Sequence, residues 1–346
     1  MEGRCAINKS SKLQVGIIGA GYWGPNLVRN FSLVAGAAVA GVADTQPKRL
    51  DFIGARYPSL RLFRDPQEMI GWDDLDAVVI STPVETHFPL AKAALAAGKH
   101  VLLEKPMCAS TAECDELLAL AKSRRLTLMV DHTFLYTGAV RKIRELIVAG
   151  ELGEILYFDS VRINLGLFQH DVNVIWDLAP HDVSIMDVVM GARAKAVSAI
   201  GRSHFGTGVE DIAYMTVTFD NAAIAHFHVN WLAPVKVRTT LIGGSRKMIV
   251  YDDTEPSEKI KVYDKGVVVT SDVEEVRKTM VQYRTGDMCA PRLDGTEALH
   301  LVADEFVTSI RDARKPLTDG ESGRRVVAVL EAANKSLVAG GQLVPL

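Results

Sequence analysis

The first residues that could perform chemistry form a glycine-rich turn. Gly19-Ala20-Gly21-Tyr22-Trp23-Gly24 follows an apolar run and precedes a helical pattern, a context in which backbone amides can bind a pyrophosphate. Asp44 ends the next apolar run, 20 residues after Gly24, where a carboxylate can bind ribose hydroxyls and repel a 2′-phosphate. The spacing predicts a dinucleotide site that prefers NAD over NADP, a preference that the nearby Arg49 could modify.

Two more polar groups follow later strands, at the edge where open parallel sheets bind ligands. Ser81–Pro83 with His87 forms one group, and Glu104–Pro106 forms the other. Lys105, with a carboxylate beside it, is a candidate acid or charge stabiliser. The alternative is a lysine in a surface salt bridge.

The elements that must position these residues alternate between strand and helix. Expected strands cover 13–18, 37–44, 76–82, 100–106 and 126–132, and expected helices cover 25–34, 47–57, 88–98 and 111–125. This alternation predicts a parallel sheet with helices on both faces.

The pattern changes after about residue 150 to consecutive strands. Candidates are 154–164, 194–203, 211–220, 222–232, 236–244 and 247–252, followed by edge strands and loops over 253–295 and helices over 296–313 and 323–338. Asp220-Asn221 predicts an antiparallel hairpin. We therefore expect an α/β N-terminal Rossmann domain over residues 1–131, followed by an α+β domain with a large, mostly antiparallel open sheet over residues 132–346.

The composition narrows the class of protein. The 346 residues are 48% hydrophobic and 23% charged, with a net charge of −3, which excludes a disordered or collagen-like chain. No basic block indicates a nucleic acid partner, and no apolar run approaches the roughly 20 residues of a membrane span. The four cysteines form no CxxC pair, so we expect reduced thiols and a cytoplasmic protein.

Several motifs together resemble a known family. GIIGAGYWGPNLVRNF, STPVETH, AGKHVLLEKP and WDLAPHD resemble the glucose-fructose oxidoreductase/inositol dehydrogenase (Gfo/Idh/MocA) superfamily over nearly the whole chain. GYWGPNLVRNF, VDHTFLYTGAVRKI, WDLAPHDVSIM and QYRTGDM are most similar to the branch that oxidises C3 of UDP-N-acetylglucosaminuronic acid in bacterial surface-polysaccharide biosynthesis. The resemblance implies an NAD-dependent oxidoreductase that acts on a CH–OH group of a small nucleotide sugar.

The resemblance also implies roles for individual residues. Lys105, Asp177 and His181 would form the catalytic group, in which His181 or Lys105 takes the hydroxyl proton while hydride passes to the nicotinamide. A spacing of four residues would place Asp177 and His181 on one helical face. The expected cofactor-binding residues are Gly19, Gly21, Tyr22, Trp23, Gly24, Asp44, Thr82, Pro83, His87, Glu104 and Lys105. The expected substrate-binding residues are Lys105, His132, Tyr136, Asn164, Gly166, His181 and Arg284, with the loop 167–173 beside them.

Other interpretations of these residues, including a metal site, stay open. A metal could be bound by Asp177, His181 and Asp182, or by His226 and His228, but hydride transfer to NAD needs only a base, so we expect no metal. The branch has mostly small residues where this chain has Asp131.

The reaction and the assembly have alternatives too. The chain could be an inositol or aldose dehydrogenase, a nucleotide keto-sugar reductase, a metal-recruiting NAD-dependent glycosidase, or a non-catalytic NAD-binding sensor. Val217, Phe227 and Trp231 are expected on an exposed sheet face, which would pair subunits into a homodimer or homotetramer.

Overall fold

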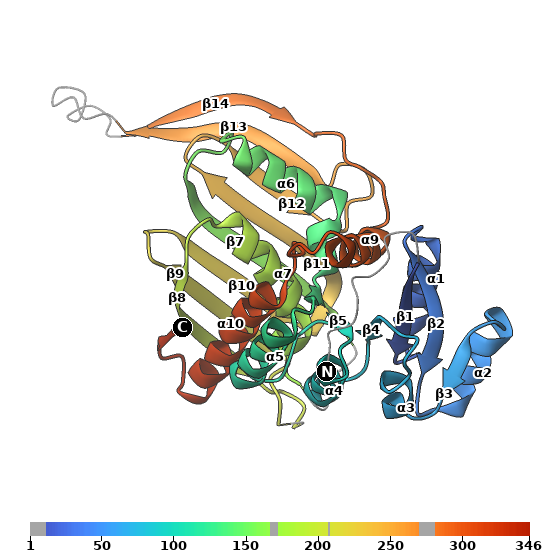
Figure 1. Cartoon of the computed structure of the whole chain (residues 1–346). Helices are drawn as coiled ribbons and strands as arrows, with labels where there is room; N and C mark the ends of the chain where they lie inside the picture. The colour runs from blue at the N-terminus through green and yellow to red at the C-terminus, as the bar shows by residue number, and fades with distance from the viewer. Residues whose placement is uncertain (1–11, 167–171, 207, 270–280) are drawn as a thin grey trace. The chain divides into compact units, whose positions relative to one another are not determined.

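The computed structural model describes residues 12–166, 172–206, 208–269 and 281–346, which form two compact units (Figure 1). The first unit comprises Met1–Tyr136 and Thr296–Val327, and the second comprises Thr137–Gly295 and Ala328–Leu346. Segment 296–327 belongs to the first unit because its helix packs there: Phe306 lies edge-on to Phe31, with ring centroids 6.3 Å apart. These units are defined by packing alone. The boundary expected between residues 131 and 132 separates an NAD-binding domain from a substrate domain by function, so it stays a prediction.

The first unit is built on a parallel sheet in the order β3-β2-β1-β4-β5-β6. Its strands are β1 (Leu13–Ile18), β2 (Ala37–Ala43), β3 (Arg61–Phe63), β4 (Ala77–Ile80), β5 (His100–Glu104) and β6 (Leu128–Asp131). Its helices are α1 (Gly24–Leu33), α2 (Pro47–Arg56), α3 (Pro66–Ile70), α4 (His87–Ala96), α5 (Thr111–Arg124) and α9 (Ala298–Arg311), with 3₁₀ turns η1 (Val84–Thr86) and η2 (Thr133–Tyr136). The central strands are buried aliphatic runs, as a sheet covered on both faces requires. The expected Rossmann architecture is confirmed.

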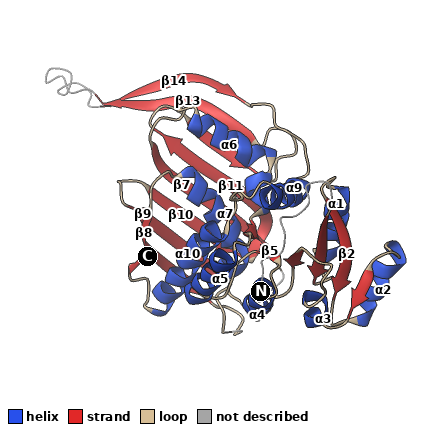
Figure 2. Ribbon diagram, in the orientation of Figure 1, coloured by secondary structure: helices blue, strands red, loops and turns tan. Residues whose placement is uncertain are grey.

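The second unit contains a larger sheet in the order β14-β13-β12-β11-β7-β10-β9-β8-β15 (Figure 2). Its strands are β7 (Ile155–Leu165), β8 (Ala194–Arg202), β9 (Ile212–Phe219), β10 (Ile224–Asn230), β11 (Leu232–Gly244), β12 (Met248–Asp252), β13 (Ile260–Val269), β14 (Val281–Cys289) and β15 (Val344–Pro345). Helices α6 (Gly138–Val148) and α7 (Val174–Val189) belong to this unit, and α10 (Gly320–Val338) spans both units. Strand pairing is antiparallel except between β7 and β10. The mostly antiparallel sheet is therefore confirmed, as is the hairpin at Asp220-Asn221.

One face of this sheet packs against helices, and this corrects the expected exposed patch. Val217, Phe227 and Trp231 are at most 1% exposed, because α7 packs on β7, β9 and β10 from their side. Alternation along a strand puts the neighbouring residues on the opposite face. Tyr214, Ile224 and Leu241, which are 37–46% exposed, lie there instead.

Some elements differ from the sequence-based expectations. The short β3 and α3, the helix α6 and the two-residue β15 were not expected. Elements as short as β3, α3 and β15 carry little periodicity. Cys108, Cys114 and Cys289 are free thiols, whereas Cys5 lies outside the described residues. Among the helices in the described ranges, none has the length and apolar character needed to cross a membrane.

Candidate functional site

The glycine turn after β1 has the geometry that its sequence predicts. Gly19 has φ +98°, and a Cβ there would lie 2.5 Å from the Ser81 carbonyl oxygen, so only glycine fits. A Cβ on Gly24 would lie 2.4 Å from the Gly19 oxygen, so the helix start packs directly on the turn. At Gly21 the nearest side-chain atom to such a Cβ is the Arg49 Nη1 at 3.7 Å. The turn is therefore tight at Gly19 and Gly24 and open at Gly21, where a pyrophosphate would approach.

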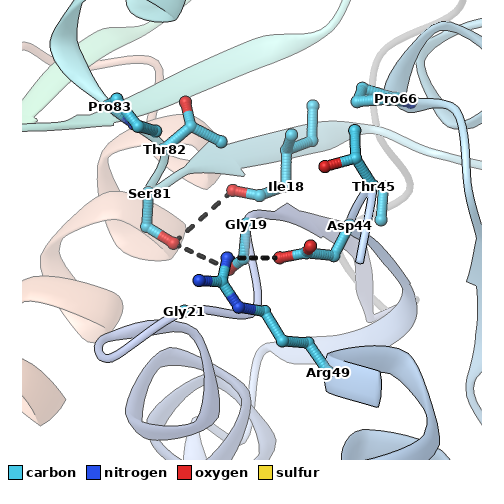
Figure 3. Close-up of a pocket in the computed structure, with 11 residues that line it drawn as sticks. Ile18, Gly19, Gly21, Asp44, Thr45, Arg49, Pro66, Ser81, Thr82 and Pro83 are labelled. Carbon is cyan, nitrogen blue, oxygen red and sulfur yellow. Dashed lines mark hydrogen bonds and ion pairs between the residues drawn. The ribbon is translucent and has the colours of Figure 1, made fainter. Parts of the chain in front are cut away.

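A cavity of about 280 Å³ lies beside this turn (Figure 3). It is lined by Ile18, Gly19, Gly21, Ala43, Asp44, Thr45, Arg49, Pro66, Ser81, Thr82 and Pro83. Asp44 is buried: its Oδ2 accepts the Ala20 N–H at 2.7 Å, and its Oδ1 accepts the Gln46 N–H at 2.8 Å. The Arg49 Nη1 lies 3.5 Å from the same Oδ2. The backbone thus fixes the carboxylate at the cavity wall, and its remaining lone pairs suit ribose hydroxyls.

Three further residues that were predicted to bind the cofactor differ in their exposure to solvent. Tyr22 and Trp23 are exposed and form a T-shaped pair, with ring centroids 5.4 Å apart. His87 is buried, with Nδ1 2.9 Å from the Pro106 oxygen and Nε2 2.8 Å from the Thr82 oxygen. Burial lowers its pKa, although both carbonyls favour the protonated ring. His87 thus ties the strand end of β4 to the Glu104–Pro106 segment, and direct contact with a cofactor stays a prediction.

Two carboxyl groups lie opposite each other at the carboxyl ends of β5 and β6. Glu104 and Asp131 are register partners, and Asp131 is buried, accepting a hydrogen bond from the Thr133 hydroxyl at 2.7 Å. Burial raises the pKa of both groups, the Asp131 charge raises that of Glu104 further, and the Lys105 charge opposes both shifts. Neighbouring buried carboxyls beside one cation titrate as a unit, so we expect this pair to hold a proton well above the usual carboxyl range.

Two predicted substrate residues lie just after Asp131. His132 is 1% exposed, and burial, with the charges of Lys105 and Arg325, lowers its pKa to about 3. Neither ring nitrogen has a hydrogen-bond partner within the described ranges, so the ring is neutral and can still bind a ligand. The Tyr136 hydroxyl lies 3.0 Å from the Thr318 Oγ1, and burial raises its pKa. Asp131 itself was not among the predicted site residues, although its departure from the branch pattern marked the position.

The second unit carries the other two predicted catalytic residues on one helix. Asn173 caps α7 by accepting the Trp176 N–H at 3.2 Å, which places Asp177 in the first turn and His181 one turn later. The Asp177 Oδ2 accepts the Trp231 indole N–H at 2.9 Å. Asp177 and His181 thus occupy one α-helix at the four-residue spacing that puts side chains on one face.

The metal alternatives find no support in this geometry. The Asp182 oxygens accept hydrogen bonds from the buried Arg162, at 2.6 Å from Nε and 2.8 Å from Nη2. His226 and His228 stack on Tyr214. Within the part of the chain that the structure describes, no group of three or more His, Cys, Asp or Glu side chains could hold a metal ion.

The predicted substrate-side residues of the second unit are partly engaged in other contacts. Asn164 and Gly166 lie at the end of β7, where the Gly166 N–H donates to the Trp231 carbonyl oxygen at 3.0 Å. Residues 167–171 of the expected loop lie outside the described residues. Arg284 pairs with Asp264 of the neighbouring strand and donates to the Arg246 carbonyl oxygen. Binding of an anion by Arg284 stays a prediction, and it would compete with Asp264.

Two family models match the chain. The model described as "Oxidoreductase family, NAD-binding Rossmann fold" matches residues 13–132. The model described as "GFO/IDH/MocA C-terminal domain" matches residues 140–250. Together they cover the glycine turn, Asp44, Lys105, Asp177 and His181.

Individual proteins are similar to this chain over nearly its full length. The UDP-N-acetylglucosamine 3-dehydrogenase of Acidithiobacillus ferrooxidans is 28% identical over 91% of this chain and 94% of that protein. The myo-inositol 2-dehydrogenase of Thermotoga maritima is 22% identical over 94% of this chain and 96% of that protein. The solved structure of UDP-N-acetylglucosamine 3-dehydrogenase GnnA from Acidithiobacillus ferrooxidans has a TM-score of 0.78 and 26% identity, covering 96% of this chain and 99% of that one.

Proposed function

Because the chain belongs to the Gfo/Idh/MocA family of NAD-binding oxidoreductases, we propose that it oxidises the C3 hydroxyl of a UDP-linked N-acetyl sugar. The observation that carries this proposal is the near full-length similarity to a UDP-N-acetylglucosamine 3-dehydrogenase, in sequence and in structure. UDP-N-acetylglucosaminuronic acid, implied by the motif resemblance, is the first substrate to try, and UDP-N-acetylglucosamine is the second.

The cofactor end of the reaction is supported by the cavity in the first unit. Gly19 and Gly24 shape the turn, Gly21 leaves it open, and Asp44 stands at the cavity wall with its carboxylate fixed. These residues fit the pyrophosphate and the adenosine ribose of NAD. The chemistry that NAD would supply when bound is a hydride acceptor, at C4 of its nicotinamide.

The chain's own residues must manage the proton and the charge at the substrate oxygen. We assign the hydroxyl proton to the His181 imidazole, whose unperturbed pKa suits a base near neutral pH. The Lys105 ammonium stabilises the negative charge that develops on the oxygen. Asp177, one turn before His181 on α7, orients the reacting group. The alcohol then loses one hydride and one proton and becomes a ketone.

The two candidate substrates differ in one group: UDP-N-acetylglucosaminuronic acid carries a carboxylate, and UDP-N-acetylglucosamine does not. A uronic acid carboxylate needs a cation, and the ion pair of Arg284 with Asp264 would have to open to supply one. The neutral sugar lacks this carboxylate, but both sugars carry a UDP diphosphate, which Arg284 could also bind. Comparing the two nucleotide sugars therefore tests the substrate and not the role of Arg284.

The test is the absorbance of NADH at 340 nm in mixtures of the protein with NAD and one sugar. The sugars are UDP-N-acetylglucosaminuronic acid, UDP-N-acetylglucosamine, myo-inositol and glucose, each with and without 2-oxoglutarate as an acceptor that could recycle bound NADH. We expect turnover with a UDP sugar only. Turnover with myo-inositol alone would favour the second candidate, which the similarity to a myo-inositol 2-dehydrogenase supports, and silence with all four would favour a sensor or an untested sugar.

We also propose that two copies of the chain associate through the exposed face of the large sheet. Tyr214, Ile224 and Leu241 are large side chains that this face exposes to solvent, and a second copy would bury them in an isologous contact. Light scattering of the purified protein should give at least a dimer, and Tyr214→Asp with Ile224→Asp should shift it to a monomer. A wild-type monomer would contradict the assembly without affecting the proposed reaction.

A further inference from the structure

Trp231 connects three segments of the second unit. It lies between β10 and β11 and is 1% exposed. Its indole N–H donates to the Asp177 carboxylate on α7 at 2.9 Å. Its carbonyl oxygen accepts the Gly166 N–H at the end of β7, and its own N–H donates to the Asp211 carbonyl oxygen at 2.9 Å. A single buried residue thus contacts the helix of the proposed base and the start of the proposed substrate loop.

The contact with Asp177 is chemically specific. An indole nitrogen can only donate, and a carboxylate can only accept, so the two groups form a charge-assisted hydrogen bond. The ring has only two side-chain torsions and is packed on all sides, so it holds the carboxylate oxygen at a defined point. A phenyl ring would fill most of the same space without the donor.

The contact with Gly166 is steric. A Cβ on Gly166 would lie 2.8 Å from the Trp231 Cδ1, which is closer than real side-chain carbons approach. The backbone at Gly166 therefore lies directly on the indole ring. The same side chain that fixes Asp177 also fixes where the chain leaves β7.

We propose that Trp231 is a positioning residue for the dehydrogenation, holding the Asp177 carboxylate in its working orientation and seating the backbone at Gly166. This role rests on the proposed function, because Asp177 matters only if α7 carries the reaction. If Trp231 had a purely structural role, its substitution would change only the stability of the fold. If it is a positioning residue, its substitution must change the reaction rate, and this change must depend on Asp177.

The chain supplies a matched control in Trp176. It precedes Asp177 on the same helix and is 8% exposed, and its indole nitrogen has no hydrogen-bond partner within the described residues. Trp176→Phe and Trp231→Phe remove the same atoms from buried rings, but only the second removes a hydrogen bond to Asp177.

The experiment is a double-mutant cycle on NADH formation with the UDP sugar that the wild-type enzyme turns over. Trp231→Phe should lower kcat by about 10- to 100-fold, as expected for one hydrogen bond to a charged group. NAD affinity and the melting temperature should match those of Trp176→Phe, which should keep its kcat. In an Asp177→Ala background, Trp231→Phe should lower kcat no further. Equal kcat for both phenylalanine variants, or an undiminished effect of Trp231→Phe in the Asp177→Ala background, would overturn the proposal.

A second measurement separates failure of this proposal from failure of the proposed function. In protein labelled with ¹⁵N-tryptophan, the indole signal that Trp231→Phe removes should move when Asp177→Ala is introduced. The signal that Trp176→Phe removes should move less. If no sugar is turned over, the proposed function fails, and an unmoved Trp231 signal would then also reject the contact on which the positioning role depends.

Discussion

The buried ion pair between Arg162 and Asp182 allows the effect of a substitution on the free energy of unfolding to be predicted. The pair joins β7 to α7, both side chains are about 4% exposed, and two hydrogen bonds of 2.6 and 2.8 Å connect them. Burial opposes the Arg162 charge, but Asp182 outweighs it and the pKa of the guanidinium is raised. Asp182→Asn would leave this charge buried without its counter-ion, a change that costs about 3–5 kcal/mol of unfolding free energy.

The cost can be read in a thermal scan. For a unit of this size, about 3–5 kcal/mol corresponds to a fall of about 6–20 °C in melting temperature. The exposed pair of Lys247 with Glu151 provides the control, and Lys247→Met should melt close to wild type. Replacing both partners of the buried pair, with Arg162→Met and Asp182→Leu, should recover much of the loss, because neither member of the pair then remains as a charge without its partner.

The reasoning would be refuted if the Asp182→Asn variant had the same melting temperature as the Lys247→Met variant. It would also be refuted by a double replacement that melts lower than Asp182→Asn alone. Because Asp182 follows His181 on α7, Asp182→Asn should also lower kcat at temperatures where the protein is folded. Calorimetry should be used for the scan, since the two compact units need not unfold in one transition.

Three further predictions concern the first unit. Asp44→Ala should weaken NAD binding, measured by tryptophan fluorescence titration, much more than NADP binding, because the carboxylate favours ribose hydroxyls and repels a 2′-phosphate; equal losses would remove it from the ribose site. Lys105→Met should lower kcat by at least about 10²-fold, as expected for loss of charge stabilisation, and leave NAD affinity unchanged; near wild-type turnover would exclude Lys105 from the catalytic group. Burial raises the pKa of Asp131, so this carboxyl contributes stability that is present at acidic pH and is lost as the pH rises through its folded-state pKa. Asp131→Asn should therefore reduce the fall in melting temperature between acidic and neutral pH, and an unchanged pH dependence would contradict the raised pKa.

The sequence predicted most reliably what depends on local pattern. Gly19 and Gly24 are glycines because the turn leaves no space for a Cβ, and the apolar runs beside them fix the strand and helix. The same holds for the four-residue spacing of Asp177 and His181, which puts both side chains on one face of α7. These features need only a few neighbouring residues to be recognised.

Features that depend on contacts between distant segments escaped prediction. Alternation correctly grouped Val217 with Phe227, but it could not say which face α7 would cover, so that face was wrongly expected to be exposed. The hydrogen bond from Trp231 to Asp177 joins residues 54 positions apart. The pairing of Glu104 with Asp131 requires the register of β5 with β6, which no single segment encodes.

The most direct test of the proposed reaction follows the hydrogen on C3. UDP-N-acetylglucosamine and UDP-N-acetylglucosaminuronic acid, each carrying deuterium only at C3, are incubated with the protein and NAD, and the reduced cofactor is analysed by mass spectrometry. The account predicts reduced cofactor that carries deuterium, together with a sugar that has lost it and become a ketone. Reduced cofactor without deuterium would contradict oxidation at C3, and no reduced cofactor from either sugar would contradict the proposed substrate class.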